Sequence, residues 1–495
     1  MPVTYAYPAS QRARGTAIRT VYENLGASGS RYRPVRIPVL GLGGASSTYS
    51  TTKRQVYSAA EVGTLYGFDS QLYQAMESLL PRNGDGVGNI PVIVHPLAQP
   101  TSGGVAAAGS ITPSGTQTVQ QSYWIKISNR LSLEIVMAVG DTVADFITAG
   151  IAAINGVLGM PGTASNGTTT LDFEVGWEGA SGNDVHIEVV SPDDSDMSFA
   201  ITQPTGGAGT VSITDALDQI GNSWDSHVLN CLEYSNTTLL SEYSTYGEGR
   251  RQPTVHKPLL VFSGSNASLA TVTAITDARP TDRTNVILTE PGSNDLPCVI
   301  AADQLRRIAK RANENPAYDY CMMDCPRLTP GPDSSQWNDA QRQSAYLAGC
   351  SSTVVVDGVV YISDVVTMYH PTGEDPPAYN KAVNNEKIAT VIYNIDREFG
   401  GNRWSGRPLV PDGQVVTNPE ARKPKAAKAA VDGILEALAK DAIISDLDFA
   451  IANSSASIGT TNPDRLDVKV VFKVSGNANV ISIDLAFSHY FEVAA

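Results

Sequence analysis

The chain has 495 residues, a length that predicts about three domains, and hydrophobic residues make up 42% of it. That apolar share supports a large core and excludes a wholly disordered protein. Lys and Arg total 35 and Asp and Glu total 50, so the net charge is −15, which argues against a general nucleic-acid coat with a basic surface. No apolar run approaches the ~18 residues of a membrane span, and the first 20 residues lack the apolar stretch of a secretory signal. We therefore expect no nucleic-acid partner and no membrane insertion.

Residues 1–36 are predicted to form an N-terminal arm. They carry six arginines against one glutamate, and glycines interrupt any helix. A basic strap on an acidic partner surface and a frayed tail both fit this composition.

Residues 37–97 are predicted to be the first part of an α/β core, with a helix over Asp69–Leu80 followed by a buried strand. Between residues 98 and 210, Gly, Ser and Thr dominate and short alternating runs recur. This change of pattern is typical of a small β-rich domain inserted into the chain. Asp141–Leu158 is the one helix expected inside it.

Residues 211–330 return to strands alternating with helices and are predicted to form a middle α/β domain with a parallel sheet. Residues 331–479 are predicted to form a C-terminal core domain. It begins with a hairpin around Asp357-Gly358, a type I′ turn signal, and continues with amphipathic helices over Glu386–Phe399 and Ala421–Lys440. The fold class we predict is thus α/β, in an α+β multidomain chain.

The chain ends in two predicted strands, Leu466–Val474 and Val480–Val493, and residues 480–495 are treated as a C-terminal arm. The second strand alternates with a period of two, so its apolar side chains share one face. A one-sided strand at a chain end is an aggregation hazard unless its own domain or a neighbouring subunit covers it. The members of its apolar face are Ile481, Ile483, Leu485, Phe487, Phe491 and Val493.

No motif with catalytic, cofactor-binding or metal-binding mechanics is present, so we predict a protein that is not an enzyme and needs no cofactor. The C-x3-C pair Cys321 and Cys325 lacks a second pair or a nearby His that would complete a metal site. A basic cluster opens the helix at 421–440, where cations oppose the helix dipole. Either a partner that attracts positive charge or a merely solvated face explains this cluster, which consists of Arg422, Lys423, Lys425 and Lys428.

Three segments, in this order, resemble the contractile phage tail sheath proteins of the Mu-like type. Val56–Gly67, continued by Ser70–Leu80, is similar to the family's early segment. Gly179–Asp184 is similar to its glycine-rich turn before a strand, and Val359–Tyr369 leading into Asp375–Phe399 to its hydrophobic strand and following helix. The resemblance covers nearly the whole chain; within 98–210 it is limited to Gly179–Asp184.

The resemblance implies a sheath-type α/β core with an inserted β-rich outer domain and extended N- and C-terminal arms. It implies a structural subunit that stacks as hexameric rings around an inner tube and contracts to drive that tube through a cell envelope. The partners implied are further copies of the chain, a tail tube protein, and baseplate and tail terminator proteins. The location implied is the virion tail, with assembly in the host cytoplasm.

The resemblance also assigns roles to the candidate residues. The arms would add strands to neighbouring subunits, and the basic helix of the C-terminal core domain would face the tube. The subunit-interface residues are then Arg12, Arg14 and Arg19 in the N-terminal arm and the apolar face of the C-terminal arm. Two other interpretations stay open: an α/β hydrolase with a β-rich accessory domain, and another virion part such as a baseplate protein.

Overall fold

The computed structural model describes residues 32–485. The predicted interface residues Arg12, Arg14, Arg19, Phe487, Phe491 and Val493 therefore lie outside the described residues. Among the described residues the chain divides into a larger unit, 32–393 with 474–485, and a smaller unit, 394–473. Because this division has only two units, the finer domain borders of the sequence analysis stay predictions.

A six-stranded sheet organises the larger unit, in the order β14-β13-β12-β1-β3-β2. All neighbours are parallel except β2, which runs antiparallel to β3. Four of these strands are buried along their whole length, as expected when helices cover both faces of a sheet. They are β1, β12, β13 and β14. The strands are β1 (Ile37–Leu42), β2 (Arg54–Val56), β3 (Val92–Leu97), β12 (His227–Asn230), β13 (Leu260–Ser265) and β14 (Asn285–Thr289).

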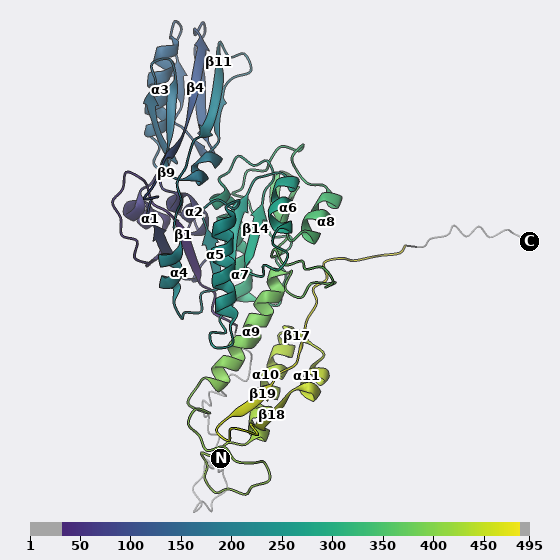
Figure 1. Ribbon diagram of the computed structural model, residues 1–495. Coiled ribbons are helices and arrows are strands. Elements are labelled where there is room, and N and C mark those ends of the chain that lie inside the picture. The colour runs from purple at the N-terminus through teal and green to yellow at the C-terminus, as the bar shows by residue number, and fades with distance from the viewer. Residues whose placement is uncertain (1–31, 486–495) are drawn as a thin grey trace, which may run out of the picture. The chain divides into compact units, whose positions relative to one another are not determined.

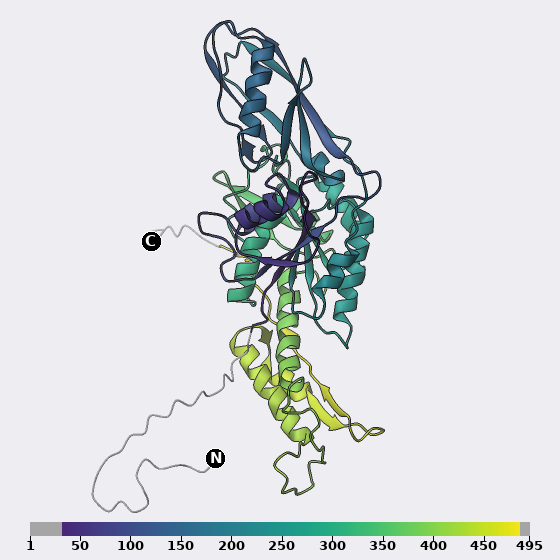
Figure 2. The ribbon, with the colours of Figure 1, turned by 90° about the vertical axis from the view of Figure 1, so that its left-hand side faces the viewer.

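Helices lie on both sides of this sheet (Figures 1 and 2). The long helix α7 packs against α2 and against β12, β13 and β14. These observations confirm the predicted α/β class. The helices are α1 (Ala59–Tyr66), α2 (Gln71–Leu79), α4 (Thr214–Ile220), α5 (Thr237–Arg251), α6 (Leu269–Asp277), α7 (Pro297–Glu314) and α8 (Asp339–Leu347).

The β-rich stretch between residues 106 and 205 forms two four-stranded sheets separate from the six-stranded one (Figure 1). The helix α3 (Val143–Asn155) packs on both, through β7 and β8. The other elements are β4 (Ala106–Gly115), β5 (Gln121–Ile127), β6 (Arg130–Leu131), β7 (Ile135–Met137), β8 (Gly162–Asn166), β9 (Leu171–Glu178), the 3-10 helix η1 (Ala180–Asp184), β10 (Ile187–Val190) and β11 (Met197–Thr205).

A hairpin and a long helix complete the larger unit. β15 (Ser352–Val356) pairs with β16 (Val359–Asp364) around Asp357 and Gly358, whose φ values are 51° and 76°. These positive angles are those of a type I′ turn, so the hairpin prediction is confirmed. The helix α9 (Ala382–Phe399) follows, and the boundary between the two units falls within it.

The smaller unit packs around α10 (Pro424–Lys440), whose buried side chains include Val431, Leu435 and Leu438. The helix begins at Pro424 rather than at the predicted residue 421, because proline favours the first helical position. The remaining elements are β17 (Ile444–Ser445), α11 (Leu447–Asn453), β18 (Ser455–Ile458), β19 (Leu466–Lys469) and β20 (Lys473–Val474).

The two long C-terminal strands were predicted wrongly within the described residues. The stretch 466–474 is broken into β19 and β20, and residues 475–485 form neither helix nor strand. The physical reason is that a strand requires a hydrogen-bonding neighbour. Among the described residues, 480–485 have none.

Gly264 tests how closely β13 packs on α7. A Cβ atom at this position would lie 1.7 Å from the carbonyl oxygen of Pro297. We expect Gly264→Ala to lower the free energy of unfolding by about 1–3 kcal/mol or more, as overpacking does. The matched control is Gly433→Ala on α10, where a Cβ meets open space; it should stabilise by about 0.5–1 kcal/mol. Urea denaturation followed by circular dichroism measures both, and equal effects would contradict the packing argument.

None of the helices within residues 32–485 combines the length and apolar character that a membrane crossing requires. In the same residues, no group of three or more His, Cys, Asp or Glu side chains is placed to hold a metal ion.

Candidate functional site

The C-terminal segment, residues 475–485, is fixed to the larger unit at its beginning only. The buried Lys387 of α9 donates hydrogen bonds from Nζ to the carbonyl oxygen of Ser475 (2.8 Å) and to Oδ1 of Asn477 (2.7 Å). Asn477 in turn donates to the carbonyl oxygen of Ala317 (2.9 Å). Residues 480–485, which follow this attachment, are exposed to solvent.

The end of this segment exposes large apolar side chains in alternation. Ile481, Ile483 and Leu485 are 76%, 80% and 84% exposed, and they lie on the predicted apolar face of the arm. Exposed apolar residues of this size are common singly, but a regular row of them marks an interaction surface. The described half of the predicted interface face is therefore accessible to a partner.

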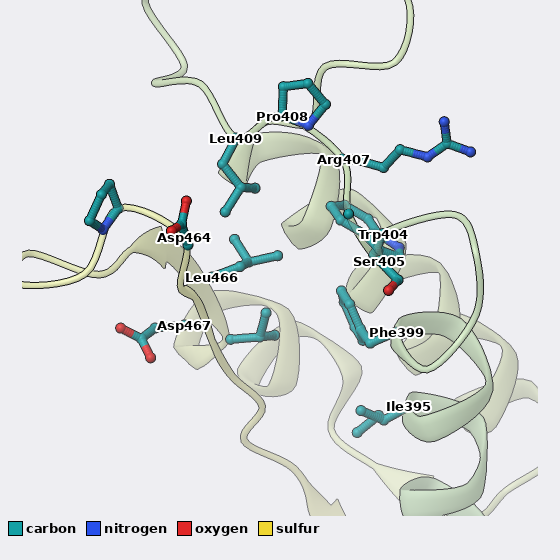
Figure 3. Close-up of a pocket in the computed structure, with 13 residues that line it drawn as sticks. Ile395, Phe399, Trp404, Ser405, Arg407, Pro408, Leu409, Asp464, Leu466 and Asp467 are labelled. Carbon is teal, nitrogen blue, oxygen red and sulfur yellow. The ribbon is translucent and has the colours of Figure 1, made fainter.

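A groove of about 1030 Å³, lined by both apolar and polar residues, lies in the smaller unit, beside β19 (Figure 3). Leu409 and Leu466 project into it from one side, and Phe399 and Trp404 lie on the other. The rings of Phe399 and Trp404 contact each other at a centroid distance of 5.2 Å. The full lining is Ile395, Phe399, Trp404, Ser405, Gly406, Arg407, Pro408, Leu409, Pro463, Asp464, Leu466, Asp467 and Val468.

The groove runs along a strand edge that has no partner within the described residues. β19 pairs with β18, from Ser455↔Lys469 to Ile458↔Leu466, and with no other described strand. The lining of the groove includes residues of β19 and none of β18. A two-stranded sheet is marginally stable alone, and a free edge is a template for a further strand. The unpaired edge of β19, with the groove beside this strand, is a candidate strand acceptor.

The predicted tube-facing cations lie together at the start of α10, but most of their charge is engaged within the smaller unit. Arg422 donates from Nε to the carbonyl oxygen of Arg403 (2.9 Å), and Lys423 donates from Nζ to that of Gln414 (2.6 Å). Lys428 forms an ion pair with Asp432, one turn along the helix. Lys425 is the exposed member of the cluster. Sequence reasoning missed these internal partners, since most lie in the irregular segment 403–420.

The first described residues are also held by α9. The guanidinium of Arg33 forms a bidentate ion pair with Glu386, and it donates to the carbonyl oxygen of Pro258 (2.7 Å). Both charged residues are buried, at 3% and 1% exposure. The imidazole of His227 lies beside them, with Nε2 4.0 Å from a Glu386 oxygen. Sequence reasoning missed this cluster; the available signal was the adjacent pair of opposite charges, Glu386 and Lys387, within an amphipathic helix.

Stability should fall on acidification because of His227. Its ring is stacked on Phe262 and held by Ser226, and burial lowers its pKa to about 4, with Glu386 opposing and Arg33 adding to that effect. Below pH 6.5 the unfolded chain therefore binds a proton that the folded chain does not. The free energy of unfolding should drop between pH 6.5 and 4, by about 3 kcal/mol for this group. His227→Gln should weaken that pH dependence in urea denaturation, and an unchanged pH profile would contradict the argument.

Comparison with known proteins gives a likeness at the level of structure only. No family model matches the chain, and no curated protein matches it. A sheath tail protein from Desulfitobacterium hafniense aligns with a TM-score of 0.46 and 11% identity over 93% of this chain and 100% of that chain. A sheath tail protein from Listeria innocua gives 0.48 and 12% over 91% and 94%. The helical sheath of the anti-feeding prophage in its contracted state gives 0.46 and 10% over 96% and 99%. The TM-scores of these three alignments are all below 0.5.

Proposed function

We propose that this protein is the structural subunit of a contractile tail sheath, which polymerises as stacked hexameric rings around a tail tube and contracts to drive the tube through a cell envelope. The observation that carries the proposal is that one chain presents both an exposed strand donor, at 480–485, and an unpaired strand acceptor, at β19. The sequence resemblance to sheath proteins supports the same function. The proposed role is mechanical and involves no catalytic centre.

A donor and an acceptor on different surfaces of one chain specify a head-to-tail contact. Such a contact closes into a ring or continues as a helical polymer, depending on the rotation between neighbours. Strand addition supplies backbone hydrogen bonds at the free edge, and alternate side chains of the donor enter the groove. This geometry leads to the repeating assembly that a sheath requires.

Burial of side chains dominates the proposed contact. Ile481, Ile483 and Leu485 would each contribute about 1.5–3 kcal/mol when fully buried, an upper estimate. Each backbone hydrogen bond would add ~0.5–1.5 kcal/mol. The groove offers matching apolar surface from Leu409, Leu466 and the Phe399–Trp404 pair.

Complementary variants test the proposal. One variant lacks the donor, by deletion of residues 480–495, and the other carries Leu466→Asp in the acceptor. Each alone should remain monomeric by light scattering and form no striated tubes by electron microscopy, whereas the unmodified protein should form tubes. Mixed together, the two should form one-to-one dimers, because only one functional donor meets one functional acceptor. Tubes from either variant alone, or no dimer on mixing, would overturn the donor–acceptor contact.

We further propose that the start of α10 faces the tail tube and binds it partly by charge. Exposed ion pairs contribute only ~0.2–1 kcal/mol each, but six subunits per ring multiply the effect. Reversing Arg422, Lys423, Lys425 and Lys428 should weaken co-sedimentation with tube protein, and more strongly at low salt. Among single changes, Lys425→Glu should have the largest effect, because the other three cations have internal partners. Lys440→Glu, at the far end of α10, is the control, and co-sedimentation independent of salt would contradict the idea.

Baseplate and tail terminator proteins are the further partners that this function requires at the two ends of the polymer. The location proposed is the virion tail, after assembly in the host cytoplasm. Both follow from the sheath role and are tested with it.

A further inference from the structure

Two adjacent residues of α9 hold the two terminal segments of the chain. Glu386 is 1% exposed and pairs with Arg33, next to the beginning of the described chain. Lys387 is 0% exposed and holds Ser475 and Asn477, at the beginning of the C-terminal segment. Burying two opposite charges on neighbouring positions is costly unless each has a partner. Here the partner of Glu386 comes from the N-terminal segment, and the partners of Lys387 come from the C-terminal segment.

A third segment, residues 317–320, takes part in holding the C-terminal segment. Ala317 accepts the hydrogen bond from Asn477. Three residues further along, Tyr320 is buried, and burial raises the pKa of its phenol well above the usual range, with Glu386 adding to the rise and Arg33 opposing it. The contacts thus form a continuous series that runs from Arg33 to Glu386, along α9 to Lys387, and through Asn477 to Ala317.

We propose that this series of contacts couples the two terminal segments, so that fixing or freeing one changes how firmly the other is held. A displacement of the C-terminal segment that removes Asn477 leaves Lys387 buried with fewer acceptors. The start of α9 and the 317–320 segment then become less firmly held. Because Glu386 is the neighbour of Lys387 in α9, its ion pair with Arg33 becomes less firmly held as well. By thermodynamic linkage, the C-terminal segment affects the stability of the N-terminal segment by the same free energy as in the reverse direction.

The consequence for assembly rests on the proposed function. If a neighbouring subunit binds the C-terminal segment, the residues around Arg33 in the subunit that donates this segment become more firmly held. Two contacts of the polymer would then form cooperatively, with Glu386 and Lys387 as positioning residues rather than as parts of either contact.

Hydrogen exchange on the full-length chain tests the coupling directly. The sample is the dispersed subunit, separated by size exclusion from assembled material. Asn477→Ala should accelerate exchange not only at Asn479, whose amide bonds to the carbonyl oxygen of residue 477, but also at Arg36 and Ile37, whose amides bond to Ser226 and Pro91. We expect about fivefold or more at the distant amides, the size of one lost hydrogen bond. The exposed Asn479→Ala is the matched control for side-chain loss and should leave Arg36 and Ile37 unchanged.

The reverse direction uses Arg33→Met, which should accelerate exchange at Asn479. The double variant Arg33→Met, Asn477→Ala should show less than the product of the two single fold-changes. Where Arg33→Met does not fold, the Asn477→Ala measurement decides alone. Acceleration confined to the mutated end, or fold-changes that multiply, would overturn the proposal. Tube formation is scored separately by electron microscopy, so a failure of coupling and a failure of the sheath proposal are distinguishable.

Discussion

Ile483→Asp is expected to abolish tube formation while leaving the subunit folded. The side chain is 80% exposed in the isolated chain, so the substitution removes no contact of the folded subunit. In the proposed assembly the same side chain enters the groove beside β19. A buried carboxylate costs several kcal/mol unless it is paired, and the arginine of the groove lining, Arg407, already forms an ion pair with Glu420. Electron microscopy and light scattering measure assembly, and circular dichroism with urea denaturation measures folding.

The matched control is Ser482→Asp, which adds the same charge one residue earlier. Successive residues of a strand point to opposite faces, so this carboxylate remains in solvent and tubes should still form. Equal loss of tubes in both variants would mean that charge, not the apolar face, is responsible. Tubes from Ile483→Asp would mean that this segment is not the connector.

The parts of this fold that depend on local pattern were predictable from the sequence. The alternation of buried strands with helices predicted the α/β class, and Asp357-Gly358 predicted the hairpin, because only a few residue types adopt two successive positive φ values. These signals lie within a few residues of one another, so one sequence is enough to detect them.

The candidate site depended on distant residues and was only half predictable. The alternation at Ile481–Leu485 predicted which side chains share the exposed apolar face, but the strand itself did not form, since no partner is present within the described residues. The groove was not predicted, because its lining joins the end of α9, a loop at 404–409 and β19, whose proximity no local pattern encodes. The cations at the start of α10 were predicted as a cluster, yet their internal acceptors were not.

We expect Asp303 to stabilise the folded larger unit, so that its substitution impairs assembly only by lowering the free energy of unfolding. On α7 its carboxylate accepts a hydrogen bond from Nη2 of Arg306 at 2.6 Å, and both side chains are fully buried. Burial raises the pKa of Asp303 and Arg306 opposes that rise. The other partner of Arg306 is Asp85, which is 44% exposed. Asp303→Ala thus leaves a buried guanidinium with one half-exposed counter-ion, and we expect a loss of about 3–5 kcal/mol in the free energy of unfolding.

Asp324→Ala is the control within the same cluster. Its carboxylate is 51% exposed and pairs with Arg307 at 3.1 Å, so its removal should cost at most about 1 kcal/mol. The double variant Asp303→Leu, Arg306→Met should recover most of the stability, because replacing a buried pair by apolar groups removes the desolvation cost of both charges. Tubes should disappear in Asp303→Ala and return in the double variant, in parallel with urea stability. Ile483→Asp should lose tubes at unchanged stability, and this contrast distinguishes a residue that holds the subunit together from one that joins it to the next.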